Sequence, residues 1–474
     1  MHIPVVDVFA GPGGLNEGFS QFRTKHGLPF FQSRLAAEMD ENAVATLRLR
    51  KFFRICAQNK SLNKYKHYLN THDSSVFKED EDWVNSQSEV AKVELGIHED
   101  NERFDKLLSS ALDKTKPWVL LGGPPCQAYS NIRRWTYRTQ DGFDLSNDHR
   151  AHLYKEYLRI IECFGPNIFV MENVKGILSS HFFERILNDL QKVRYKKLGY
   201  RIHSLVLPAD EISRPHDFLV KAEDYGVPQS RHRVILLGVR TDIKSTPTNL
   251  KKSQQTTNVL DALGDLPKLR SGFSKDENSN DNWQSFVEVN LEKLCNELGQ
   301  NKISVEMLEQ SSQNFKPYKT NNPLKNFLYK DHLGFITNHE TRGHISEDVK
   351  RYAFCALYGL KFGKSPKTTD FPAHLVPKHK NWQSGKFNDR FRVQLKDSPS
   401  TTITSHIAKD GHAYIHYDPA QARSLTVREA ARLQTFPDNY HFEGPRTEQY
   451  KQVGNAVPPY LARQIAEIIY DLLS

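Results

Sequence analysis

The sequence predicts an α/β protein: a doubly wound, mostly parallel sheet, followed by a second, smaller and more irregular domain. Three observations predict this fold class. Short apolar runs alternate with helical patterns over about the first 240 residues. This alternation stops between about 241 and 420, and two helical patterns then close the chain. Strands alternating with helices favour a parallel sheet with helices on both faces.

The predicted strands are short runs that end in glycine or a polar residue. They are 3–11 (IPVVDVFAG), 33–40 (SRLAAEMD), 117–123 (PWVLLGG), 166–174 (PNIFVMENV) and 231–240 (RHRVILLGVR). Helices are expected at 13–22 and at 153–164, where the apolar residues recur at helical spacing on one face. The carboxyl ends of such strands are where ligands bind in this architecture.

The remaining segments set the expected domain boundaries. Residues 49–116 are rich in Lys, Asn and Glu and resemble an insertion between strands. Residues 274–285 (SKDENSNDNWQS) are expected to be loop, and helices are expected at 426–436 and 458–474. The expected domains are 1–240, completed by 445–474, and 241–444.

Composition indicates a soluble globular chain of two domains. The 474 residues are 38% hydrophobic and 26% charged. No run approaches the eighteen or so apolar residues of a membrane span, and no signal peptide is recognisable. The five cysteines are scattered without a CxxC pair, which argues against zinc and against a disulfide framework. We therefore expect no metal site and a reducing, cytoplasmic compartment.

Positive charge is concentrated in one region. The formal net charge is +9, and residues 311–400 hold sixteen Lys and Arg against seven Asp and Glu. The rest of the chain is therefore neutral overall. Aromatic residues and Arg are interleaved at 385–394 (GKFNDRFRVQ). A polyanion-binding surface explains this pattern, and ordinary solvated lysines are the simpler alternative.

A glycine turn follows the first strand. Gly11, Gly13 and Gly14 lie between strand and helix, where glycine lets the backbone approach a ligand closely. No GK[ST] follows, so the turn is not a P-loop. Glu38, at the end of the second strand, is suitably placed to bind ribose hydroxyls. The pattern favours a nucleoside cofactor over a purely structural turn.

A cysteine turn follows the third predicted strand. Pro124 and Pro125 make the backbone before Cys126 rigid, which suits a nucleophile more than a core thiol. Glu172 lies near the end of another strand and is expected in the same crevice, although a capping carboxylate is the alternative. Arg231 and Arg233 are two residues apart and are expected on one face, suited to a phosphate or a base carbonyl. A solvated edge strand is the alternative for these arginines.

The order of these motifs resembles the DNA (cytosine-5) methyltransferase family. DVFAGPGG is similar to its cofactor motif, GGPPCQAYS to its catalytic motif and MENVKG to its ENV motif. QSRHRVILLG is similar to its arginine motif, and RSLTVREAARLQTFPD and VGNAVPPYLA to its last two motifs. The resemblance spans nearly the whole chain and implies an S-adenosylmethionine-dependent methyltransferase fold with a target-recognition domain. It implies a DNA (cytosine-5-)-methyltransferase acting in restriction-modification or as an orphan enzyme.

The resemblance also assigns the chemistry. Cys126 would add to C6 of the target cytosine, which makes C5 nucleophilic towards a sulfonium methyl donor. Glu172 would hold N3 as a protonated carboxyl group, which requires a pKa raised by burial. Arg233 would contact the cytosine carbonyl and Arg231 the backbone or the loop, and either could lower the pKa of the Cys126 thiol.

The cofactor implied by the resemblance is S-adenosyl-L-methionine. Phe9 would contact adenine, Glu38 the ribose, and Asp73 is the nearest acidic residue to the adenine contact that the family has after its third strand. The remaining residues implied around the cofactor are Gly11, Gly13, Gly14, Leu15, Asn455 and Val457.

The implied partner is double-stranded DNA, bound by a monomer, with a restriction endonuclease as a separate chain. A cytosine in a duplex cannot present C6 to a thiol, so base flipping is required. Residues 128–150 would close over DNA, residues 311–400 would bind its backbone, and the irregular domain would read the major groove. The implied DNA contacts are Gln127, Ser130, Arg133, Arg134, Arg138 and Gln229.

Three alternatives remain. An RNA cytosine methyltransferase shares the motif order, but the region of about 180 residues after the arginine motif favours duplex DNA. A non-catalytic binding protein of the same fold is disfavoured because Cys126, Glu172, Arg231 and Arg233 are all present. A thiol protease is disfavoured because no protease motif surrounds Cys126.

Overall fold

The computed structural model describes residues 2–113, 115–125, 153–179, 181–377, 382 and 390–474. The chain divides into two compact units. The first unit comprises Met1–Tyr225, Arg231–Ser253 and Ala456–Ser474, and the second comprises Gly226–Ser230 and Gln254–Asn455. Cys126 and the implied DNA contacts Gln127, Ser130, Arg133, Arg134 and Arg138 lie outside the described residues.

The first unit is built on one sheet. Its strands are β1 (Ile3–Val8), β2 (Phe31–Glu38), β3 (Val90–Lys92), β4 (Val119–Gly122), β5 (Ile168–Val174), β6 (Tyr200–His203), β7 (Leu219–Lys221) and β9 (His232–Arg240). They run in the order β3-β2-β1-β4-β5-β9-β6, and β7 also pairs with β9. The pairs from β3 to β5 are parallel, whereas β9 is antiparallel to β5, β6 and β7. The predicted mostly parallel sheet is confirmed.

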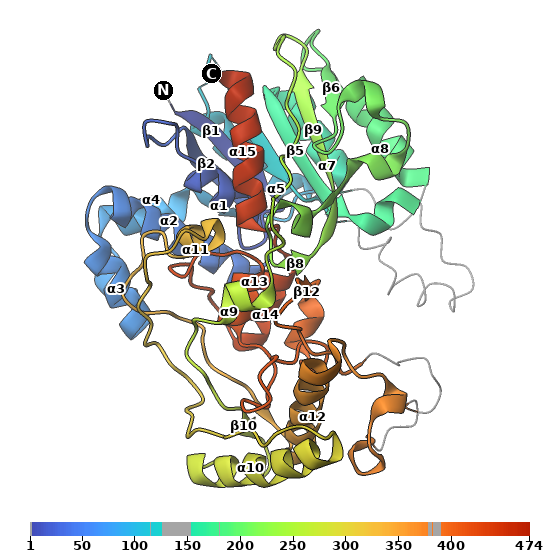
Figure 1. Cartoon of the computed structure of the whole chain (residues 1–474). Helices are drawn as coiled ribbons and strands as arrows, with labels where there is room; N and C mark the ends of the chain where they lie inside the picture. Colours follow the sequence, from blue (N-terminus) through green and yellow to red (C-terminus); the bar gives the residue numbers. More distant parts are fainter. Residues whose placement is uncertain (1, 114, 126–152, 180, 378–381, 383–389) are drawn as a thin grey trace. The chain divides into compact units, whose positions relative to one another are not determined.

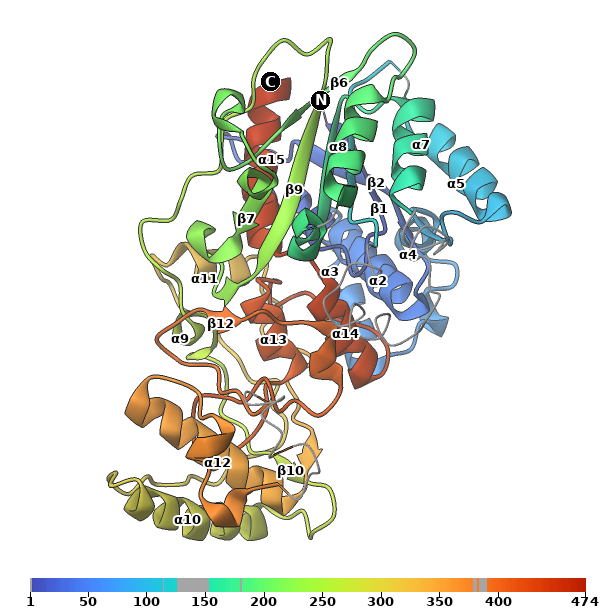
Figure 2. The same ribbon diagram turned by 90° about the vertical axis from the view of Figure 1, so that its right-hand side faces the viewer.

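Helices cover both faces of this sheet (Figure 2). They are α1 (Gly14–Gln21), α2 (Glu41–Gln58), α5 (His98–Ala111), α7 (Tyr154–Phe164), α8 (His181–Lys192) and α15 (Pro459–Leu473), while α3 (Leu62–Thr71) and α4 (Glu81–Ser88) pack on α2. Buried side chains of α5, α7 and α8 form one core with the strands. On the other face α1 packs closely on α15 at Gly18. A Cβ atom at Gly18 would lie only 2.4 Å from Ala462 Cβ. Only glycine permits this close approach.

Segment 49–116 is more than the insertion that its composition suggests. It contains β3, the edge strand of the sheet, and α5, which packs against β2. The strands β3, β6 and β7 are three or four residues long and carry no clear alternation, which is why the sequence did not predict them.

The second unit joins helices through irregular segments. Its elements are β8 (Gln229–Ser230), α9 (Val259–Leu263), β10 (Gly272–Phe273), α10 (Asn280–Glu297), α11 (Pro323–Leu328), β11 (Gly343–His344), α12 (Ser346–Phe362), β12 (Ser400–Thr401), α13 (Val427–Leu433) and α14 (Arg446–Asn455). Figure 1 shows α10 beside α12, and their buried side chains form one core. The expectation of loop at 274–285 is wrong in its second half, since the Ser279 side chain caps the start of α10.

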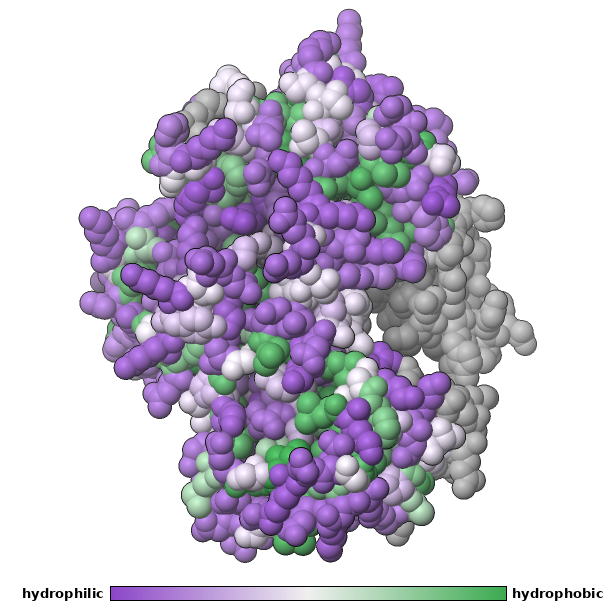
Figure 3. Space-filling view, in the orientation of Figure 1, coloured by the Kyte–Doolittle hydropathy of each residue, from purple (hydrophilic) through white to green (hydrophobic). Residues whose placement is uncertain are grey.

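The surface is mainly polar. Figure 3 shows hydrophilic residues over most of the face in view, with smaller apolar patches between them. Among the described helices, none is long and apolar enough to cross a membrane.

Candidate active site

The two glycines that follow Leu121 leave room for neighbouring groups. A Cβ atom at Gly122 would lie 2.6 Å from a ring carbon of Tyr157, so only glycine fits there. A Cβ atom at Gly123 would lie 3.1 Å from Glu172 Oε2. Gly122 therefore faces the layer of α7, and Gly123 faces the carboxylate of Glu172. The two glycines therefore leave room for the Tyr157 ring and the Glu172 carboxylate.

Asn173 holds the backbone of the cysteine turn. Its Nδ2 donates a buried hydrogen bond of 3.1 Å to the carbonyl oxygen of Pro124. Its Oδ1 accepts from the backbone N–H of Val174 at 2.8 Å, which orients the amide. Asn173 is 6% exposed. The sequence prediction named Glu172 from the same motif but missed this anchoring residue.

Glu172 and Arg233 form an ion pair at the strand ends. Arg233 Nε lies 2.9 Å from Glu172 Oε1, and the two side chains keep 16% and 12% of their exposure. On the ladder Glu172 lies opposite Ile235 and Val174 opposite Arg233, so the pair is diagonal on one face. Burial lowers the pKa of the Arg233 guanidinium, and the charge of Glu172 opposes this shift. The pair leaves Glu172 Oε2 directed to Gly123.

Arg231 differs from Arg233 in its surroundings. It lies between β8 and β9, its backbone carbonyl accepts from Ala222 N–H at 3.0 Å, and it is 2% exposed. The two arginines were predicted on one face, and the structure gives Arg233 the carboxylate partner and places Arg231 in the interior.

Gln229 is buried inside the second unit. Its Nε2 donates to the carbonyl of Leu433 at 3.1 Å and to Gln434 Oε1 at 2.6 Å. Its Oε1 accepts from Ile403 N–H at 2.8 Å. With 0% exposure, its amide serves the interior of this unit, and the DNA contact predicted for Gln229 finds no support in this geometry.

Glu38 binds the glycine turn to the end of β2. Its Oε2 accepts from the backbone N–H of Gly11 at 2.8 Å. Its Oε1 accepts from the N–H groups of Met39 at 2.9 Å and Asp40 at 3.0 Å. Burial raises the pKa of Glu38, and these backbone donors counteract part of the rise. The predicted cofactor carboxylate and glycine turn are therefore in direct contact.

The turn itself holds residues in left-handed backbone geometry. Phe9 has φ 53°, an unfavourable value for a residue with a side chain, and Gly11 has φ 53° as well. A Cβ atom at Gly11 would meet nothing within 4 Å among the described residues, which leave space beside this glycine. Gly13, with φ 86°, precedes the first turn of α1.

Gly14 and Val457 are brought together by backbone contact. A Cβ atom at Gly14 would lie 2.1 Å from the carbonyl oxygen of Val457, so the turn requires glycine here. Leu15 is 5% exposed and Val457 is 7% exposed. Asn455 is the exposed last residue of α14 in the second unit.

Asp7 is a buried acid that the sequence prediction missed. It is 1% exposed, and its Oδ2 has no hydrogen-bond partner among the described residues. Burial raises its pKa to about 8, while the backbone N–H of Asn16 in α1 opposes the rise. The available signal was an aspartate within the otherwise apolar run IPVVDV.

Asp73 is not the residue after the third strand. It follows α3, is exposed, and its carboxylate accepts from Ser75 N–H at 2.8 Å. The third strand, β3, begins at Val90, and the acidic residue beyond it is the exposed Glu94. Val93 N–H donates to the Glu38 carbonyl at 3.0 Å, so Glu94 follows a strand end adjoining Glu38. The placement of Asp73 is therefore corrected.

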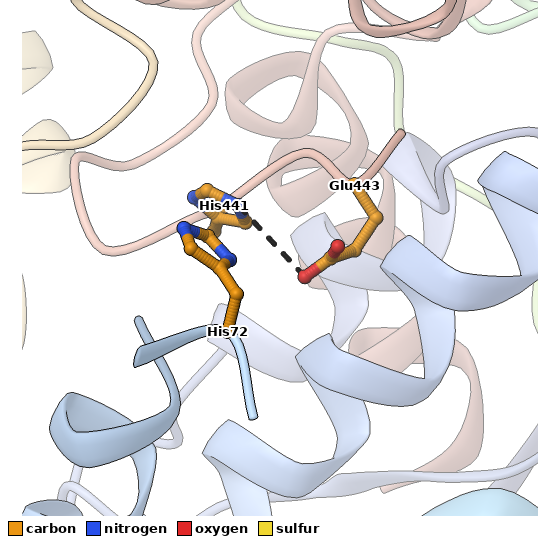
Figure 4. Close-up of side chains that lie close together, drawn as sticks. All are labelled: His72, His441 and Glu443. Atoms are coloured by element: carbon orange, nitrogen blue, oxygen red, sulfur yellow. Dashed lines mark ion pairs between the residues drawn. The ribbon is translucent and has the colours of Figure 1, made fainter. Parts of the chain in front are cut away.

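Neither unit contains, within its described residues, a group of three His, Cys, Asp or Glu ligand atoms close enough to hold an ion. In the second unit His441 Nε2 lies 3.8 Å from Glu443 Oε1, an ion pair drawn in Figure 4. Two side chains of this kind are a local pair rather than a metal centre.

Comparisons with known proteins agree with the motif order. The family model for C-5 cytosine-specific DNA methylases matches residues 96–471. Type II methyltransferase M.Bpa9945I of Bacillus paralicheniformis is 32% identical, over 99% of both chains. Type II methyltransferase M.AgeI of Thalassovita gelatinovora is 27% identical over 99% of both chains.

The fold has a counterpart among solved structures. A prophage-encoded protein of E. coli, described as a DNA modification methyltransferase, superposes with a TM-score of 0.60 at 21% identity, over 99% of both chains. The family model and the full-length relatives together lead to one conclusion: this chain belongs to the C-5 cytosine-specific DNA methylase family.

Proposed function

We propose that the chain transfers a methyl group from S-adenosyl-L-methionine to C5 of a flipped-out cytosine in a specific duplex DNA sequence. The observation that carries this proposal is the Glu172–Arg233 pair, 2.9 Å apart, beside the glycine that leads into the cysteine turn. A carboxyl group and a guanidinium at the ends of β5 and β9 match the polar edge of cytosine.

The reaction begins at Cys126. Its thiolate adds to C6, and the electrons of the C5–C6 double bond make C5 nucleophilic. C5 would take the methyl group with release of S-adenosylhomocysteine. Loss of the C5 proton to solvent would then re-form the double bond and expel the thiolate, and the N3 proton would return to Glu172. Asn173 supports this step because its bond to the Pro124 carbonyl limits movement of the turn that carries the nucleophile.

Glu172 and Arg233 would bind the base. Glu172 Oε2 would face N3 and hold the proton that keeps negative charge off the ring during thiolate addition. Arg233 would contact the O2 carbonyl while its Nε remains with Glu172 Oε1. Arg231 is proposed to support the backbone next to this pair from the interior.

The glycine turn fits the methionine and adenosine parts of the cofactor. Support comes from three features of the described residues: the space beside Gly11, the left-handed Phe9, and the buried Asp7 oxygen that has no hydrogen-bond partner among them. When bound, the cofactor supplies an electrophilic methyl group on a sulfonium centre. Phe9 would contact adenine, Glu38 the ribose, and Glu94 takes the acidic position beyond the third strand that Asp73 does not occupy.

The second unit is proposed to bind and read double-stranded DNA, with residues 128–150 closing over it. Residues 311–400, with their excess of Lys and Arg, would contact phosphates, and Arg133, Arg134 and Arg138 would do so from the loop. Relatives named type II methyltransferases favour a restriction-modification role with a separate endonuclease. We propose a monomer acting in the cytoplasm; the four described cysteines are free thiols.

The decisive experiment is methyl transfer by the Cys126→Ser variant. We expect loss of transfer to duplex DNA while cofactor and DNA binding persist, because a hydroxyl is a far weaker nucleophile than a thiolate. Full activity in the variant would refute the mechanism. Assays with a tRNA and a DNA duplex separate the substrates, and transfer to tRNA alone would refute duplex DNA. Bisulfite sequencing of DNA from expressing cells would give the recognition sequence.

A further inference from the structure

His232 lies between the two arginines of the arginine motif and has its own partner. Its Nε2 is 2.6 Å from Glu223 Oε1, and the two side chains are 30% and 19% exposed. Glu223 belongs to the 3-10 turn η8 (Ala222–Tyr225), which directly follows β7. Lys221 of β7 is opposite His232 in the ladder, so this contact joins the end of β7 to the start of β9.

The contact with His232 satisfies one oxygen of the Glu223 carboxylate. Its second oxygen, Oε2, is buried and has no hydrogen-bond partner among the described residues. Ala222 N–H also donates to the Arg231 carbonyl at 3.0 Å. The backbone of residues 231 and 232 is thus held by one backbone bond and one side-chain pair from the same turn.

This backbone is in direct contact with the Arg233 side chain. The carbonyl oxygen of His232 accepts from Arg233 Nη1 at 2.8 Å, while Arg233 Nε lies 2.9 Å from Glu172 Oε1. A continuous series of contacts therefore runs from Glu223 through His232 and Arg233 to Glu172. A guanidinium has a fixed planar set of donors, so the position of one acceptor determines the direction of the others.

We propose that Glu223 and His232 are a positioning pair, which fixes the His232 carbonyl and so directs the Arg233 guanidinium towards Glu172 and the target base. The pair acts through Arg233 and does not touch the substrate. This inference rests on the proposed roles of Arg233 and Glu172.

The test compares His232→Leu, His232→Gln, Glu223→Leu and the double leucine variant in methyl transfer to duplex DNA. We expect His232→Leu to lower kcat at least about tenfold, since small misplacements at a reacting centre are costly. The KM for S-adenosylmethionine should change little. His232→Gln, which keeps a donor of similar reach, should restore most of kcat, and the double variant should match the single ones.

His98→Leu is the matched control, because His98 Nδ1 lies 3.7 Å from Glu102 Oε1 with both side chains mostly exposed. Unchanged kcat in His232→Leu, additive losses in the double variant, or a parallel loss of cofactor affinity would overturn the positioning role. Arg233→Ala distinguishes a failure of the Glu223–His232 pair from a failure of the proposed role of Arg233. If it abolishes transfer while His232→Leu does not affect kcat, only the pair is refuted. If Arg233→Ala keeps full activity, the proposed role of Arg233 fails too.

Discussion

The two units use arginine–carboxylate pairs in different ways. In the first unit, the Glu172–Arg233 pair keeps 12% and 16% of its side-chain exposure at the ends of β5 and β9. In the second unit, Arg423 and Glu429 are each 1% exposed, and both ends of the guanidinium contact the carboxylate, at 2.6 and 2.7 Å. The second pair has no surface left for a ligand, whereas the first one does.

The partners of the two carboxylates sharpen this contrast. Glu429 also accepts from the backbone N–H of Thr426 at 2.8 Å and so caps α13. The charge of Arg423 holds the pKa of Glu429 well below its usual range, although burial alone would raise it. Glu172, by contrast, has an oxygen directed to Gly123. Motif arginines therefore serve structure where their donors are used internally, and chemistry where a polar edge stays open.

The substitution that should lower activity most is one that breaks the Glu172–Arg233 pair. Glu172→Gln keeps the shape of the side chain but cannot transfer a proton to N3, so methyl transfer should fall by about 10²–10⁴. The free energy of unfolding should change less than in the matching variant of the fully buried Glu429, because the Gln oxygen can still accept from Arg233 Nε and the pair keeps some exposure. Single-turnover methylation and urea unfolding measure the two quantities. Retained transfer, or a collapse of stability, would contradict the assignment of this pair to chemistry.

The matching change in the second unit is Glu429→Gln. It leaves the buried Arg423 guanidinium without a counter-charge, and breaking such a buried pair costs about 3–5 kcal/mol. We expect this loss in the free energy of unfolding, while the α13 cap persists because the Gln oxygen can still accept from the Thr426 N–H. The activity per folded molecule should fall much less than in Glu172→Gln. A Glu429→Gln variant that is stable but inactive would contradict the assignment of the Arg423–Glu429 pair to structure and the Glu172–Arg233 pair to chemistry.

The fold class could be predicted because the long strands are buried on both faces. β1, for example, is buried at all six positions, and its run is apolar apart from Asp7. The edge strand β3 has three residues, and its third, Lys92, is exposed, so composition alone describes its surroundings as an insertion. The error at Asp73 has the same origin: without β3, the nearest acidic residue was sought too early in the chain.

The sequence predicts which residues belong to the candidate site better than it predicts which of them are in contact. Strand-end positions indicated that Glu172 and Arg233 share a crevice. The direct pair depends on β9 running antiparallel to β5 in a register that sets the two side chains diagonally. Register is determined by packing and is not visible in one sequence. Asn173 and His232 were missed for a related reason, since each acts through a backbone carbonyl.

The smallest expected effect concerns a neutral imidazole in the second unit. His344 is 6% exposed, its Nε2 lies 3.2 Å from Ser424 Oγ, and its Nδ1 lies 3.4 Å from the Tyr352 hydroxyl. Burial lowers its pKa to about 3, helped by the nearby charge of Arg342. Since an unfolded histidine titrates near 6.5, only the unfolded chain gains this proton between about pH 6.5 and 3.

His344 therefore contributes stability above about pH 6.5 that is lost as the pH falls, by at most about 1.4 kcal/mol per pH unit. His344→Gln should flatten the pH dependence of the unfolding free energy by up to this slope between pH 6 and 5. Urea unfolding of both proteins at several pH values measures the difference. An equal slope in His344→Gln and the parent chain would show that this imidazole is protonated in the folded unit, and the contrast between its closed interior and the open pair at Glu172 would then weaken.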